Sequence, residues 1–316
     1  MDLALRPMST SQVLDRTFSL YRQNFILFAG IAALAPACLL LIRFLTLSIG
    51  RASTNGMAGM IAAGVAAGLA MIALFILWLI GYVLSYGATV YAVSRFHLGH
   101  GTSIREAYGL IRPYAGRLVG IVILAFLAVV AVTLVAFIAG AALVFATGGF
   151  KGGPSGGVIL ILVLLVVATI LADLYVSAKF ALSVPACVIE NLGVTDSMRR
   201  SSQLAQGSIL RLVLVNFLAA IISLVLSMVL SVPYFIGVAL MVTKKDPAAL
   251  VPFLMLQYVA EFLASSLAFP IATIAVSLIY YDERVRKEAF DLQLMMQTLG
   301  YAEPAQAATG AAPGIG

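Results

Sequence analysis

Charged and chemically reactive side chains are scarce in this sequence of 316 residues. Only 10% of the residues are Asp, Glu, Lys or Arg, and the chain has two histidines, two cysteines and one tryptophan. A soluble protein of this length exposes far more charge. The longest polar stretch inside the chain, residues 94–116, is too short to build a core of its own. The composition therefore excludes a separate soluble catalytic domain within these residues.

The scarcity of histidine argues against several kinds of active site. A metal-dependent phosphodiesterase needs a pair of histidines and several carboxylates around its metal. His97 and His100 share one polar segment with no carboxylate before Glu106, which favours a solvated turn over a metal site. The metalloprotease motif His-Glu-x-x-His is absent, and no histidine lies at membrane depth to activate a serine. We therefore expect no catalytic residue, no metal, no cofactor and no enzymatic activity.

Long apolar stretches make up most of the chain. Each exceeds the roughly 20 residues that a helix needs to cross the hydrocarbon core. They are residues 25–49, 60–92, 118–146, 158–184, 209–242 and 250–279. The sequence predicts an all-α polytopic membrane protein with six transmembrane helices. Its expected parts are an N-terminal segment over 1–24, a membrane domain over 25–281, a cytoplasmic amphipathic helix over 282–300 and a disordered tail over 301–316.

A similar polar segment precedes the first, third and fifth apolar stretches. Each begins with a Ser or Thr able to cap a helix and then mixes apolar and basic residues at helical spacing. Thr10, Thr102 and Thr195 mark the three segments at intervals of 92 and 93 residues. The pattern predicts three parallel hairpin repeats, each preceded by a cytoplasmic interfacial amphipathic helix.

The basic residues are unevenly divided between the two sets of connections. Thirteen of the 19 lie on the side of the N-terminus, five lie on the other side, and Lys179 falls within a span. This bias predicts that both termini are cytoplasmic. The thirteen are Arg6, Arg16, Arg22, Arg95, Arg105, Arg112, Arg117, Arg199, Arg200, Arg211, Arg284, Arg286 and Lys287, and the five are Arg43, Arg51, Lys151, Lys244 and Lys245.

These cytoplasmic basic residues suggest anionic membrane lipids as partners rather than nucleic acid. Within the first interfacial segment, Val13, Thr17 and Tyr21 belong to the face expected to lie in the acyl boundary, with arginines among the headgroups. The predicted headgroup contacts are Arg16, Arg22, Arg105, Arg112, Arg199, Arg200, Arg284 and Arg286.

Three charged residues fall inside the predicted spans, namely Asp173, Lys179 and Glu261. Charges at membrane depth are costly and suggest a functional site. One interpretation is a polar pocket or proton path shared by the fourth and sixth helices. The other is a structural cluster that fixes the register of the helices, and the small number of such charges favours it. Asp173 and Lys179 are six residues apart and cannot pair directly on one helix.

Residues 5–25, 184–201 and 280–292 resemble bacterial proteins described as the membrane domain of glycerophosphoryl diester phosphodiesterase. The resemblance extends from residue 5 to about residue 294, and this chain is similar to the solitary form, without the catalytic barrel to which the domain is sometimes fused. It implies a bacterial cytoplasmic (inner) membrane location. It brings no catalytic residues to carry over.

Together these features predict a non-enzymatic integral membrane protein, either a lipid-associated scaffold or an accessory component of an envelope system with a membrane-protein partner. The alternative is a small transporter or channel that uses Asp173 and Glu261. An intramembrane enzyme ranks third, because its motifs are missing. A continuous polar cavity joining the two carboxylates would favour transport.

Overall fold

The computed structural model describes residues 8–52, 56–97, 99–148, 155–241 and 251–288, and in these ranges the chain is helical with short connections. Five helical stretches are long and apolar enough to cross a membrane, and a bent helix pair near the N-terminus makes a sixth if it counts as one span. An all-helical protein with membrane-spanning helices is therefore confirmed. This is the expected outcome where no water is present to bond with exposed backbone groups.

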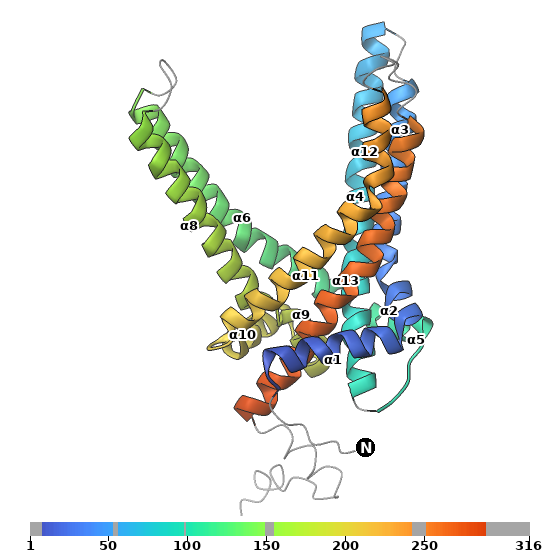
Figure 1. Cartoon of the computed structure of the whole chain (residues 1–316), viewed down its shortest axis with the longest axis vertical. Coiled ribbons are helices and arrows are strands. Elements are labelled where there is room, and N and C mark those ends of the chain that lie inside the picture. Colours follow the sequence, from blue (N-terminus) through green and yellow to red (C-terminus); the bar gives the residue numbers. More distant parts are fainter. Residues whose placement is uncertain (1–7, 53–55, 98, 149–154, 242–250, 289–316) are drawn as a thin grey trace, which may run out of the picture.

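The helices form two diverging arms on a common base (Figure 1). One arm is the hairpin of α6 (Ala115–Ala146) and α8 (Gly156–Phe180). The other contains α3 (Leu34–Ala52), α4 (Gly56–His97), α12 (Val232–Met241) and most of α13 (Val251–Glu288), with α11 (Ile209–Leu230) rising toward it from the base.

The base is the end of the molecule where the shorter helices gather around the C-terminal end of α13 (Figure 1). They are α1 (Thr10–Gln23), α2 (Phe25–Ala32), α5 (Ile104–Ile111), α9 (Ser183–Glu190) and α10 (Val194–Ala205). A short 3-10 helix, η1 (Arg112–Tyr114), joins α5 to α6. The first described residue, Met8, bonds to Asp282 of α13, so both ends of the described chain meet at the base.

Helices occupy all three segments predicted to precede a hairpin, and two have the expected serine caps. Ser9 and Gln12 form a reciprocal capping box at the start of α1. Ser103 accepts the backbone N–H of Glu106 at the start of α5. The third helix, α10, begins after Gly193 without a side-chain cap bond.

The apolar face of α1 packs on protein rather than facing acyl chains as predicted. Val13, Thr17 and Tyr21 are buried, and the Tyr21 hydroxyl donates to the backbone oxygen of Leu267 in α13 at 3.0 Å. Burial raises the pKa of Tyr21 to about 12. The spacing of four residues lets these side chains form one stripe, which α13 covers.

Two predicted spans are divided. The first bends by 43° between α2 and α3, and the fifth is broken at Ser231 between α11 and α12. Pro36 and Pro233 stand in the first turns of α3 and α12, where a missing N–H costs little. Pro270, by contrast, lies inside α13 without ending it.

The buried core lies toward the base. Its largest fully buried side chains include Phe28, Leu118, Leu212 and Tyr280, from four different helices, and Leu182 in the turn between α8 and α9. The outer parts of α6 and α8 instead expose large apolar residues, among them Phe126, Phe137, Leu160 and Ile170. This distribution is typical of a surface in contact with lipid tails, since such a surface need not be hidden from water.

Candidate functional site

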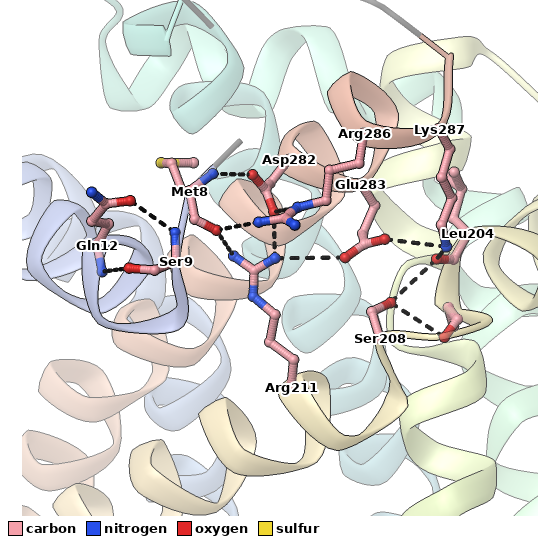
Figure 2. A network of polar contacts seen from close by, with 11 residues as sticks. Met8, Ser9, Gln12, Leu204, Ser208, Arg211, Asp282, Glu283, Arg286 and Lys287 are labelled. Atoms are coloured by element: carbon pink, nitrogen blue, oxygen red, sulfur yellow. Dashed lines mark hydrogen bonds and ion pairs between the residues drawn. The ribbon is translucent and has the colours of Figure 1, made fainter. Parts of the chain in front are cut away.

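A network of charged residues closes the base around Asp282 (Figure 2). Both oxygens of this carboxylate are engaged, and its side chain is 0% exposed. The Met8 backbone N–H donates to Oδ1 at 2.5 Å. Arg286 donates to Oδ2 at 2.8 Å, and Arg211 forms an ion pair with the same oxygen. A buried carboxylate is stabilised only when partners of this kind surround it.

Glu283 extends the network to the turn between α10 and α11 (Figure 2). It pairs with Lys287 at 3.1 Å and with Arg211 at 3.6 Å. Lys287 also donates to the backbone oxygens of Leu204 at 2.5 Å and Gln206 at 2.6 Å. We call Met8, Arg211, Asp282, Glu283, Arg286 and Lys287 the Asp282 network.

Two arginines of the Asp282 network meet at the backbone of Met8. Arg211 donates to the Met8 oxygen at 3.0 Å, and Arg286 donates to it at 2.6 Å. The backbone of one residue at the start of α1 therefore holds contacts from both α11 and α13. The network joins three elements that are remote in sequence.

A second network links α9 and α10 to α13. Arg200 donates to both oxygens of Glu190, with distances of 3.0–3.1 Å from Nε, and it also pairs with Glu288. Arg284 lies 3.3 Å from Glu288 and 3.6 Å from Glu190, and the Tyr280 hydroxyl donates to Glu190. We call these five residues the Arg200 network.

The Arg200 network alters the acidity of its central arginine. Hydrogen bonding to Glu288, and then to Glu190, raises the pKa of Arg200 above its ordinary value, although burial opposes the shift. The guanidinium thus stays charged throughout the accessible pH range. Forked contact with two carboxylates is the geometry in which arginine is most effective.

Asp173 lies on the α6–α8 arm, away from both networks. Its Oδ2 accepts the Thr133 hydroxyl of α6 at 3.0 Å. Its Oδ1 is buried without a hydrogen-bond partner among the described residues. The carboxyl borders a largely apolar groove of about 630 Å³ between the two helices, together with small residues such as Ala136 and Gly140.

Glu261 lies on the other arm and pairs with Arg43 of α3 at 3.5 Å. The Arg43 guanidinium is also 5.4 Å from the centre of the Tyr258 ring. Lys179 lies 5.8 Å from the ring centre of its neighbour Phe180. The predicted cluster of Asp173, Lys179 and Glu261 is therefore not formed, because the two carboxylates lie on diverging arms with partners of their own (Figure 1).

The family model described as the membrane domain of glycerophosphoryl diester phosphodiesterase matches residues 157–299. The predicted family resemblance is confirmed over these residues. They contain α8 to α13 and every charged side chain of the Asp282 and Arg200 networks. No curated protein and no solved structure matches the chain.

Three of the predicted lipid contacts have internal partners instead. Arg200 and Arg284 belong to the Arg200 network, and Arg286 belongs to the Asp282 network. Their carboxylate partners lie up to 94 residues away or at helical spacing, which charge counting alone does not reveal. The other five, Arg16, Arg22, Arg105, Arg112 and Arg199, are exposed and have no hydrogen bond or ion pair within the described part of the chain.

The Asp282 and Arg200 networks were not predicted from the sequence, although one signal was present. Asp282 and Glu283 follow the sixth apolar stretch directly, and Arg211 stands at the third position of the helix α11. An arginine at the edge of an apolar stretch and two carboxylates at the edge of another are paired more often than free.

Proposed function

We propose that this integral membrane protein is a non-enzymatic, lipid-associated scaffold of the bacterial cytoplasmic membrane, with both termini in the cytoplasm. The main observation behind the proposal is that the arginines at the base fall into two groups, one paired within the protein and one exposed. Some are engaged by the two networks, while Arg16, Arg22, Arg105, Arg112 and Arg199 remain exposed on α1, α5, η1 and α10. Exposed arginines beside apolar spans suit anionic headgroups, at about 1 kcal/mol each.

The proposed architecture is three parallel units, each with an interfacial helix followed by a hairpin. The order of elements supports it. The helix α1 precedes the pair formed by α2–α3 and α4, α5 precedes α6 and α8, and α10 precedes the pair formed by α11–α12 and α13. Parallel units place all three short helices on one side of the membrane, which agrees with the positive-inside bias.

A membrane-protein partner would find its largest apolar contact area on the α6–α8 arm, whose flanks are exposed along most of their length. The transporter alternative required Asp173 and Glu261 to share a site. Because each carboxyl group has its partner on a separate arm, we do not propose transport.

The scaffold proposal is tested by lipid selection in a mixed bilayer. A donor dye at Thr102→Cys, in a background without Cys38 and Cys187, reports energy transfer to acceptor-labelled phosphatidylglycerol or phosphatidylcholine. We expect stronger transfer to phosphatidylglycerol, and we expect this preference to weaken at high salt. Replacement of Arg16, Arg22 and Arg199 by glutamine should remove most of it.

The matched control replaces Lys151, Lys244 and Lys245 by glutamine, which deletes the same charge from the connections predicted to face outside. This control should leave the preference unchanged. Equal effects of the two triple variants, or no preference in the parent protein, would contradict the proposal.

A further inference from the structure

A pocket of about 410 Å³ lies at the base between α4, α5, η1, α6 and α9. Its walls are apolar or aromatic, with Tyr91, Leu110, Tyr114 and Val188 among them. The guanidinium of Arg117 is the charged group in its lining. Aromatic rings, apolar walls and one cation at the end of a span are the surroundings that an interfacial lipid needs.

Arg117 is held in place from one side. Its Nη1 donates to the side-chain oxygen of Asn191 at 2.8 Å and contacts the Asn191 backbone oxygen at 3.4 Å. The guanidinium carbon also lies 5.6 Å from the centre of the Tyr114 ring. Asn191 ends α9 in the left-handed conformation, with φ of 53°. The contact therefore joins α6 to the C-terminal end of α9.

The other edge of the same guanidinium has no hydrogen-bond partner among the described residues. The Nε–H and Nη2 groups of Arg117 donate to no acceptor in the described ranges, and the side chain is exposed. No carboxylate among those residues forms an ion pair with it. The Nε–Nη2 edge is the fork with which arginine grips two oxygens of one phosphate. The five arginines of the proposed lipid-facing set do not line this pocket.

We propose that this pocket is a discrete site for the phosphodiester of a membrane phospholipid, gripped by the free edge of Arg117, with an acyl chain along Leu110 and Val188. The proposal rests on the lipid-associated function stated above and sharpens it, because it assigns one bound lipid rather than a general attraction. A free phosphate offers the same oxygens without the chains, so the test separates the two sources.

Native mass spectrometry of the full chain, released from detergent after titration with phosphatidylglycerol, measures the discrete site. We expect one phospholipid retained per protein, no comparable adduct with diacylglycerol, and no displacement by millimolar inorganic phosphate. Arg117→Gln should lower the fraction with one bound lipid about tenfold, since a charged hydrogen-bonding group is lost. Arg117→Lys should restore it only partly, because lysine lacks the fork.

Two further variants separate lipid binding from folding. Val188→Phe leaves Arg117 untouched but narrows the pocket, and it should reduce the one-lipid species. Asn191→Gly keeps the left-handed backbone and its carbonyl but removes the side-chain acceptor, and it should weaken retention less than Arg117→Gln. Lys151→Gln, the charge control, should leave retention unchanged. Each variant should unfold near the parent temperature.

The outcomes are distinguishable. If inorganic phosphate displaces the bound phospholipid at concentrations as low as those at which phospholipid binds, the pocket is a site for free phosphate and the lipid site is overturned. Equal retention by the parent and Arg117→Gln would overturn the proposal altogether. If the bilayer still prefers phosphatidylglycerol in that case, the scaffold function stands while the discrete site fails.

Discussion

Arg211, like Asp282, contacts three other members of the Asp282 network. It reaches Asp282, Glu283 and the Met8 backbone oxygen, and its side chain is only 13% exposed. Its removal leaves two nearly buried carboxylates with one cation fewer. The cost of breaking a buried ion pair in this way exceeds the gain from forming it.

We therefore expect Arg211→Met to lower stability by about 3–5 kcal/mol. Thermal unfolding in detergent, followed by circular dichroism, measures the effect. Arg286→Gln is the matched control, because its side chain is 40% exposed and its loss leaves Arg211 in place. The double variant Arg211→Met with Asp282→Asn should be less destabilised than the sum of the single variants, since the two residues share one network. If the effects of the two substitutions simply add, Arg211 and Asp282 do not stabilise the protein as one network.

The two intramembrane carboxylates should respond to neutralisation with opposite signs. Asp173 carries a buried oxygen without a described partner, so Asp173→Asn should raise the unfolding temperature, with a gain of about 1 kcal/mol from removing a charge at membrane depth. Glu261 has an ion pair with Arg43, so Glu261→Gln should lower stability by roughly 0.6–2 kcal/mol. Thermal scans of both variants in one detergent would show whether the shifts differ in sign.

The contacts of single residues are the feature of this molecule that the sequence predicts least well. It identifies Asp173 and Glu261 as unusual, because charges are rare in apolar stretches. It does not identify their partners, since Thr133 and Arg43 are 40 and more than 200 residues away. The sequence likewise does not identify the partner of Arg200, because no pattern indicates that α10 packs against α9 with Arg200 facing Glu190.

At the scale of helices, the Arg200 network governs how the α6–α8 arm is joined to the rest of the molecule. Glu190 ends α9, which follows α8 directly, and Arg200 on α10 connects it to Glu288 at the end of α13. A serine adds to this junction, because Ser201 accepts the Leu182 N–H at 3.1 Å and donates to the Lys179 oxygen at 2.8 Å. These contacts connect the α6–α8 arm to α13 through α9 and α10.

Arg200→Gln should therefore loosen the angle between the arms. Spin labels at Leu164→Cys in α8 and Leu256→Cys in α13, both exposed positions, report the distance between the arms. We expect the distance distribution to broaden by several ångström in the variant. Arg199→Gln removes the same charge from the adjacent exposed residue and should leave the distribution narrow. A broadening of equal size in both variants would point to general charge loss instead.

The pH dependence of this junction follows from the same residue. A raised pKa means that the contribution of charged Arg200 is complete below its ordinary pKa and is lost only as the pH rises through the raised value. That window lies above roughly pH 12. Arg200 therefore stays charged between about pH 6 and 9, and we expect the distance distribution between the labels to be constant over this range.

Helix positions were more predictable than contacts. Apolar length predicted both ends of the first five spans to within five residues, and it predicted the start but not the end of the sixth. Serine caps indicated α1 and α5. Pro36 and Pro233 mark the breaks at Ala33 and Ser231 to within three residues, whereas Pro270 shows that a proline in an apolar stretch need not end a helix. The predicted boundary at residue 281 is also not a helix end, since α13 runs on to Glu288. Residues 289–316, with the remainder of the predicted cytoplasmic helix and the predicted tail, lie outside the described residues.

For the molecule as a whole, the central prediction is its orientation in the membrane. Single cysteines at positions 102 and 196, in a background without Cys38 and Cys187, should react with a membrane-impermeant maleimide only after the cells are opened. Single cysteines at 53, 152 and 246 should react in intact cells. The physical reason is the bias of 13 to 5 basic residues between the two sides. Labelling of position 102 or 196 from outside would reverse the topology.

The contact between Met8 and Asp282 can form only late in the synthesis of the chain. The two residues are 274 positions apart, so translation at ~5–20 residues per second separates their appearance by roughly 15–55 s. During that interval the first five spans can enter the membrane, while α13, which contains Asp282, is still being made. Until then the start of α1 has no carboxylate to bind and Arg211 has no Asp282. Most of the nascent protein is thus inserted before this contact can form, and a ribosome that stops short of residue 282 releases a chain whose two ends cannot be joined.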